Sequence, residues 1–223
     1  MTAVVATFRQ VPDFAVGFVR DHRVRWAHEE IGRPYEVAPV DRESVQTGGY
    51  LAWQPFGQVP AYRDGEVEMF ESGAIVLHIA KSTEALAPRD EAGFARVASW
   101  VFAAVNSVEP HVGNFVELDG FHAGEAWVEG YRPVAEAQLR RRLASLETWL
   151  DGRDYLDGRF TAADIMMSTT LRELEESGIL GDYPRVAAYL NRCQSRPAWK
   201  RALGRGEDLM REDSRGKRTV IQG

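Results

Sequence analysis

The residues most able to do chemistry begin in the stretch 54–60, QPFGQVP. Proline has no amide hydrogen to donate to a β-ladder. Pro60 begins a predicted strand. We therefore expect it to lie at a sheet edge or directly after a sharp turn, and a cis peptide bond is one form that such a turn can take. A cis bond would leave the backbone of Val59 free to pair with an extended, peptide-like ligand. The alternative is an ordinary turn that leads into an edge strand.

A second chemical feature is the pair Glu71-Ser72, where a predicted strand ends and a predicted helix begins. The first amides of a helix have no partner within it and carry a partial positive charge. Together with the Ser72 hydroxyl they can hold a ligand carboxylate, while the Glu71 carboxylate holds a neighbouring ammonium group. The α-carbon of an amino acid carries both groups. The alternative is helix capping alone, with Ser72 as the N-cap.

Short strands and helices alternate in the chain before residue 82. A strand, a helix and a second strand in succession predict parallel pairing of the two strands. Asp64-Gly65 favours a hairpin turn, which makes the next two strands antiparallel. The predicted order is β-α-β followed by β-β-α, with strands over 3–8, 35–40, 59–63 and 66–70 and helices over 18–31 and from residue 72.

The chain after about residue 88 has helical periodicity. The polar, turn-rich stretch 82–93 is the predicted linker. The stretch 205–223 loses apolar content, and we expect it to be a mobile tail unless it folds back over a cleft. The predicted helices after the linker cover 91–117, 125–151, 162–177, 184–195 and 197–204.

Composition narrows the possible partners. A net charge of -6, from 27 basic and 33 acidic side chains, offers no general attraction to nucleic acid or to an anionic membrane. The one cysteine, Cys193, excludes an intramolecular disulfide, and no Cys/His group has metal-ligand spacing, so we expect no metal. The sequence has no signal-peptide pattern and no stretch approaching the ~18 apolar residues that cross a bilayer. These observations predict a soluble, cytoplasmic protein.

Four segments together resemble the glutathione transferase superfamily: RVRWAHEEIGRPYEV, QPFGQVPAYRDGEVEMFESGAIVLHIA, FTAADI and YPRVAAYLNRCQSRPAWKRA. The order and spacing of these segments agree with the family, and the resemblance extends over most of the chain, from about residue 3 to residue 204. It implies an α/β plus all-α architecture: a thioredoxin-like, glutathione-binding domain over 1–82 is followed by an all-helical domain over 90–204, which completes the electrophile site. It also implies a homodimer.

The resemblance also assigns roles by matching position. Val59, before Pro60, would pair with the cysteinyl backbone of glutathione, and Gln58 would lie against the glycyl end. Glu71 and Ser72 would hold the γ-glutamyl end. A tripeptide with two carboxylates and one ammonium group suits a groove built from a strand edge, a helix N-terminus and an acid.

The segment TAAD, 161–164, matches a capping box. In a capping box the Thr161 side chain accepts a hydrogen bond from the backbone near Asp164, whose carboxylate accepts one from the Thr161 amide. We interpret Asp164 as a folding determinant worth about 1 kcal/mol or more, rather than as a catalytic group. Cys193 is expected to pack as a small apolar residue rather than to react.

The stretch 9–23, RQVPDFAVGFVRDHR, departs from the family pattern. Family enzymes commonly lower the pKa of the glutathione thiol with a Tyr, Ser or Cys in this region, and the stretch contains none. Cations also favour a thiolate, so Arg20, in the first turn of the predicted helix, and Arg9, just after the first strand, are the candidates. The alternative is that both arginines face solvent. His22 and His28 are interpreted as exposed surface histidines.

The resemblance implies that the second substrate lies between the two domains. Phe14, Phe18, Asn106 and His111 are the candidate residues for that site. Aromatic residues at helical spacing are also typical of an ordinary core.

The resulting hypothesis is a glutathione transferase. It would conjugate glutathione, its co-substrate, to a small electrophile, or use glutathione to reduce a peroxide. The missing hydroxyl keeps a second hypothesis open, a non-catalytic module of the same fold that acts in binding or interaction. A third is a specialised glutathione-dependent dehalogenase or isomerase.

Overall fold

The chain folds into two compact units. The computed structural model describes residues 2–12, 15–204 and 220–221. The N-terminal unit contains Met1–Pro88 together with Arg196–Gly223, and the helical unit contains Arg89–Ser195.

The C-terminal boundary of the helical unit differs from the predicted helical domain over 90–204. Residues 197–204 are helical, as predicted, but they group with the N-terminal unit. Most of the predicted tail, 205–223, lies outside the described residues. Its residues 220–221 form a short strand that pairs with the sheet of the N-terminal unit.

A five-stranded sheet forms the centre of the N-terminal unit. Its strands are β1 (Ala3–Phe8), β2 (Tyr35–Val40), β3 (Ala61–Asp64), β4 (Val67–Phe70) and β5 (Val220–Ile221). They lie in the order β4-β3-β1-β2-β5. β1 and β2 pair in parallel, whereas β3 pairs antiparallel with both β1 and β4. These pairings confirm the predicted parallel pair and the hairpin at Asp64-Gly65.

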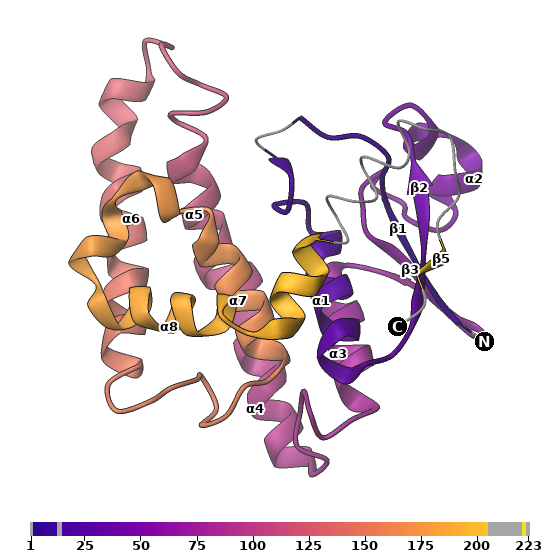
Figure 1. Cartoon of the computed structure of the whole chain (residues 1–223). Coiled ribbons are helices and arrows are strands. Elements are labelled where there is room, and N and C mark those ends of the chain that lie inside the picture. The colour runs from indigo at the N-terminus through magenta and orange to yellow at the C-terminus, as the bar shows by residue number, and fades with distance from the viewer. Residues whose placement is uncertain (1, 13–14, 205–219, 222–223) are drawn as a thin grey trace. The chain divides into compact units, whose positions relative to one another are not determined.

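Helices cover both faces of this sheet (Figure 1). Helices α1 (Asp21–Ile31) and α3 (Ser72–Lys81) lie on one face, and the short α2 (Gly48–Leu51) lies on the other. Helix α1 ends at Gly32, whose φ of 62° is the left-handed conformation that glycine adopts readily. A 3₁₀ turn, Ser44–Gln46, precedes α2. This order of elements is a thioredoxin-like fold.

Helix α1 is buried along nearly its whole length, charged side chains included. Among these side chains, Asp21 and Arg25 form a buried ion pair, with 2.8 Å between Oδ2 and Nε. The prediction that His22 and His28 are surface histidines is wrong, because their exposed fractions are 1% and 0%. His22 lies against Trp199 of the segment 196–204, and His28 lies against Tyr35 and Tyr62 of β2 and β3. Sequence periodicity does not report either contact.

Arginines from both elements bind 196–204 to α1. The Arg196 guanidinium donates two hydrogen bonds to the Glu30 carboxylate, each 2.7 Å long. In the other direction, Arg25 of α1 donates to the carbonyl of Ala202 at 2.7 Å. Paired arginine–carboxylate bonds are geometrically specific, so they define where the segment lies along the helix.

The helical unit contains α4 (Glu91–Phe102), α5 (Glu109–Val116), α6 (Val128–Trp149), α7 (Ala162–Arg172) and α8 (Pro184–Gln194). A π-helical turn, Ala103–Val108, separates α4 from α5 and divides the stretch predicted as one helix over 91–117. Two 3₁₀ turns, Glu175–Ser177 and Ile179–Asp182, connect α7 to α8. In the part of the chain that the structure describes, no helix combines the length and apolar character needed to cross a membrane.

The capping box predicted at the start of α7 is present. The Asp164 carboxylate accepts hydrogen bonds from the amides of Thr161, at 2.8 Å, and Leu156, at 3.0 Å. The hydroxyl of Tyr189, on α8, donates to it at 3.0 Å. Desolvation outweighs these bonds and raises the pKa of Asp164 to about 6. The carboxyl group therefore joins the start of α7 to the preceding loop and to α8. Cys193, also on α8, is buried as expected.

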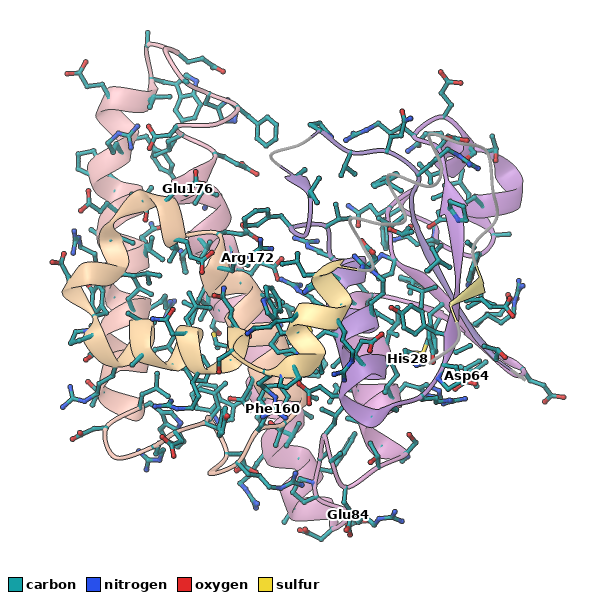
Figure 2. All side chains as sticks on the ribbon, in the orientation of Figure 1. His28, Asp64, Glu84, Phe160, Arg172 and Glu176 are labelled. Atoms are coloured by element: carbon teal, nitrogen blue, oxygen red, sulfur yellow. The ribbon has the colours of Figure 1, made fainter. Side chains whose placement is uncertain are left out.

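A second polar network, only partly buried, connects α1 with the end of β3, where Figure 2 labels His28 and Asp64. His28 Nε2 lies 3.1 Å from the Tyr62 hydroxyl, and its Nδ1 lies 3.2 Å from the Arg33 carbonyl. The Arg33 guanidinium donates two hydrogen bonds to Asp64, at 3.0 and 2.7 Å, and His78 Nε2 lies 3.4 Å from the same carboxylate. Burial lowers the pKa of His28 to about 4, so its ring is neutral at pH 7.

We expect the neutral, buried His28 to make the fold sensitive to acid. Its pKa is about 4 in the folded state and 6.5 when unperturbed, so the unfolded chain binds the extra proton across this interval. The stability that depends on the neutral ring is complete above pH 6.5 and is lost as the pH falls toward 4, by about 3 kcal/mol in total. Urea unfolding of the wild type and of His28→Gln measures this loss.

Other groups that titrate in this interval, Asp164 included, contribute equally to the wild type and to His28→Gln. Their contributions therefore drop out of the difference in unfolding free energy between the two proteins. The unfolding free energy of the wild type should fall relative to that of the variant as the pH is lowered through this interval. A difference between the two proteins that stays constant with pH would contradict the prediction.

Candidate functional site

The residues predicted to bind a ligand meet in one hollow of the N-terminal unit. Three segments form this hollow: the start of α1, the loop before β3, and the junction of β4 with α3. The hollow is lined by Arg20, Gln54, Gln58, Val59, Pro60, Glu71 and Ser72. The structure thus brings together the predicted glutathione-binding residues and one of the two predicted cations.

Val59 lines this hollow, and its main-chain polar groups are unpaired within the residues that the structure describes. The Val59-Pro60 bond is cis, one of the forms expected for the turn before β3. In the described part of the chain, neither the amide nor the carbonyl of Val59 has a hydrogen-bond partner. Unpaired backbone groups beside a sheet are what an extended, peptide-like ligand needs.

The junction of β4 with α3 has an unusual backbone conformation. Glu71 has a φ of 69° and a ψ of 112°, and no other non-glycine residue that the structure describes has a positive φ. Such a conformation costs about 1–3 kcal/mol in a residue with a side chain, and strain of this kind clusters at functional sites. Glu71 is the N-cap of α3, so the prediction of Ser72 as N-cap is wrong. The turn out of β4 occurs one residue earlier, which makes Ser72 the first helical residue.

The N-terminus of α3 has no side-chain cap among the described residues. Its first intrahelical backbone bond runs from the Ile75 amide to the Glu71 carbonyl, at 2.9 Å. The amides that precede Ile75 in the helix therefore remain open to an anion, and the helix dipole adds partial positive charge.

Arg23 is a site residue that the sequence analysis missed. Its side chain is only 3% exposed, and its Nη1 donates a hydrogen bond to Ser72 Oγ at 3.3 Å. That bond uses a lone pair of the oxygen, which leaves the Ser72 hydroxyl hydrogen able to donate to a ligand. Arg23 also brings a positive charge beneath the N-terminus of α3. The sequence could have indicated Arg23 through its spacing, because a residue three positions after Arg20 lies on the same face of a helix.

The two predicted cations have different surroundings. Arg20 is the N-cap of α1, is exposed, and lines the hollow. Arg9 is not among the lining residues, and its Nε lies 3.1 Å from a carboxylate oxygen of Asp41. The geometry therefore favours Arg20 over Arg9 as the cation near a bound ligand.

The residues predicted for a second substrate lie in different parts of the chain. Phe14 is outside the described residues, and Phe18 is exposed in the N-terminal unit. In the helical unit, Asn106 is exposed in the π-helical turn, and His111 is half-buried in α5. The His111 Nδ1 atom is buried with no hydrogen-bond partner among the described residues. Within those residues, no group of three or more His, Cys, Asp or Glu side chains is arranged to hold a metal ion.

Comparison with protein families finds two adjacent matches. Residues 14–81 match the model "Glutathione S-transferase, N-terminal domain", and residues 102–197 match "Glutathione S-transferase, C-terminal domain". Both the strand-rich part of the chain and its helical part are covered.

Individual relatives agree with these matches. The chain is 30% identical over 196 residues to glutathione S-transferase APIC of Nicotiana tabacum, covering 76% of this chain and 85% of that protein. It is also 28% identical to elongation factor 1-gamma 1 of Oryza sativa subsp. japonica, over 77% of this chain but 41% of that protein. A crystal structure of a glutathione transferase from Burkholderia graminis, with two glutathione molecules bound per subunit, has a TM-score of 0.80 at 26% identity, covering 91% of this chain and 87% of that one.

The strained Glu71 backbone leads to a stability prediction. Glycine tolerates a positive φ, whereas alanine retains the strain, so Glu71→Gly should be about 1 kcal/mol more stable than Glu71→Ala. Both variants remove the same carboxylate, and only the backbone preference differs between them. Urea unfolding of the two proteins measures the difference. Equal stabilities, or a more stable alanine variant, would mean that the backbone at position 71 relaxes out of this conformation in the alanine variant.

Proposed function

The chain belongs to the glutathione transferase superfamily, and from this premise we propose that it binds glutathione in the hollow and adds it, through its sulfur, to a small electrophile. The observation that carries the proposal is the meeting of Glu71, Ser72 and the unpartnered Val59 main chain in one hollow. These groups supply an anion for an ammonium, donors for a carboxylate, and a backbone edge for a peptide.

Each part of glutathione then has a chemical counterpart. The α-carboxylate of the γ-glutamyl end accepts from the Ser72 hydroxyl and the open amides of α3, with the buried Arg23 adding positive charge. The Glu71 carboxylate holds the adjacent ammonium group. The cysteinyl amide and carbonyl pair with Val59, and Gln58 lies against the glycyl end. Pro60 follows Val59 in the wall of the hollow.

Activation of the thiol is assigned to Arg20. Residues 9–23 contain no Tyr, Ser or Cys that could donate to a thiolate. A guanidinium in the wall of the hollow stabilises the charged form of a bound thiol and so lowers its pKa. The thiolate then forms a carbon–sulfur bond with the electrophile, as a leaving group departs or a double bond opens and takes up a proton. With a peroxide, the thiolate attacks one oxygen, the O–O bond breaks, and a second glutathione converts the resulting sulfenic acid to the disulfide and water.

The proposal includes a homodimer and a cytoplasmic location. Phe56, in the loop before β3, is 66% exposed, and its ring lies 6.0 Å from that of Phe70. A large exposed aromatic side chain of this kind is suited to burial against a second copy. Cys193 is the one cysteine of the sequence, is buried and forms no disulfide, which is compatible with a reducing compartment. Phe18, which is exposed in the N-terminal unit, is a proposed contact of the electrophile.

A non-catalytic binding module is the second candidate. Two observations favour it: residues 9–23 contain no hydroxyl or thiol side chain, and the chain resembles part of an elongation factor 1-gamma. A module of this kind would keep the fold and the hollow, but it would leave the thiol pKa of bound glutathione unshifted.

Glutathione binding can be tested at Glu71. We expect Glu71→Ala to weaken binding by roughly tenfold or more, because the ammonium group loses its charged partner inside a partly buried site. Isothermal titration calorimetry measures the affinity. Glu68→Ala, which removes an exposed carboxylate of β4 outside the hollow, is the matched control. Undiminished affinity in Glu71→Ala would mean that the ligand binds elsewhere.

Thiol activation can be tested by titrating bound glutathione through the ultraviolet absorbance of its thiolate. In the wild type the bound thiol should have a pKa well below that of free glutathione, and Arg20→Ala should raise it. The same titration of Arg9→Ala separates the two predicted cations. A shift caused by Arg9→Ala alone would refute the assignment to Arg20, whereas an unshifted pKa in the wild type would favour the non-catalytic module.

A further inference from the structure

The loop before β3 is folded around the oxygen atoms of one residue, Gln54. Its side chain is 2% exposed, and Oε1 accepts hydrogen bonds from the amides of Phe56, at 2.7 Å, and Gln58, at 3.1 Å. Its main-chain carbonyl accepts from the amide between them, that of Gly57, at 3.1 Å. Three consecutive amides of the loop are therefore bound by Gln54.

Tyr50 binds the main-chain carbonyl group of Gln58. Its hydroxyl donates to the Gln58 carbonyl at 2.7 Å. Burial raises the pKa of Tyr50 to about 12, so the hydroxyl keeps its proton at physiological pH. The Tyr50 carbonyl also accepts from the Gln54 amide at 2.8 Å, which joins the two residues.

The Gln58 main chain is thus fixed at both of its polar groups, by Gln54 at the amide and by Tyr50 at the carbonyl. The Gln58 carbonyl belongs to the peptide unit that contains the Val59 amide. A planar peptide unit rotates as one body, so the bond from Tyr50 also fixes the direction of the Val59 amide. The Gln58 side chain and the Val59 main chain are the groups proposed above to contact glutathione.

We propose that Gln54 and Tyr50 are positioning residues for glutathione, an inference that rests on the proposed function. They act through the Gln58 main chain: together they hold the loop in its ligand-ready conformation before glutathione arrives. Preorganisation of this kind removes an ordering cost from binding, so its loss should appear in the affinity for glutathione.

Three variants test the proposal. Gln54→Met keeps the size of the side chain but removes the acceptor, which leaves two amides without a partner. It should weaken glutathione binding by roughly tenfold, the range expected for a lost buried hydrogen bond. Gln54→Glu retains an acceptor oxygen and should restore most of the affinity. Tyr50→Phe removes only the hydroxyl and should weaken binding by several-fold.

The matched control is Tyr62→Phe, which removes another buried tyrosine hydroxyl of the same unit. That hydroxyl contacts His28 and is not in the wall of the hollow. Tyr62→Phe should lower the melting temperature and leave the affinity for glutathione unchanged. Calorimetric affinities and melting temperatures of all four variants separate a general loss of stability from a loss of positioning.

Hydrogen exchange of the Phe56 and Gln58 amides reports on their hydrogen bonds to Gln54 in the absence of any ligand. Exchange should be faster in Gln54→Met and close to the wild-type rate in Gln54→Glu. The proposal is overturned if Gln54→Met binds glutathione as tightly as the wild type, or if Tyr62→Phe weakens binding as much as Tyr50→Phe. A wild type that binds no glutathione, with the amides still protected, would refute the proposed function instead and remove the premise of this inference.

Discussion

The buried charged side chains of helix α1 constrain the N-terminal unit. Each of these charges needs a partner, and some of the partners come from other segments that must lie against the helix. Its glutamates Glu29 and Glu30 are bound by arginines of the segment 196–204, at 2.9 and 2.7 Å. An unpaired charge at such a position would be strongly destabilising. With its charges paired, the helix can lie between the sheet and that segment, while Arg20 at its N-cap lines the hollow and Arg23 in its first turn contacts Ser72. The chemistry of the site therefore depends on pairing that occurs along the rest of the helix.

Much of the recognition chemistry proposed for the hollow comes from the main chain. The open amides of α3 and the peptide groups of Val59 belong to the fold itself, and in the proposed complex the side chains of Glu71 and Ser72 add selectivity to them. Main-chain groups can be aimed only by shaping the backbone, which is why the strained φ of Glu71 matters to the site. It also explains why two short stretches, 54–60 and 71–72, contained most of the functional signal in the sequence.

Local signals predicted the features that depend on neighbouring residues. Asp64-Gly65 predicted the hairpin, and the residues 161–164 predicted the capping box, because both features act within a few residues. The burial of His28 and the role of Arg23 were missed for a common reason. Both lie in a helix whose polar residues look solvent-facing, and the elements that cover them are distant in the sequence. Hydrophobic periodicity reports an apolar face, but it cannot report a polar face that is covered by another part of the chain.

The path of the chain between the two units has a consequence for how this protein can be made or divided. The chain leaves the N-terminal unit after residue 88 and re-enters it at residue 196, so Glu30 and the arginine that binds it are 166 residues apart. During synthesis on the ribosome, α1 must wait for the whole helical unit to be translated before its glutamates acquire their partners. A fragment cut at residue 88 would likewise lack the arginines that bind Glu29 and Glu30, and it would expose these carboxylates to water.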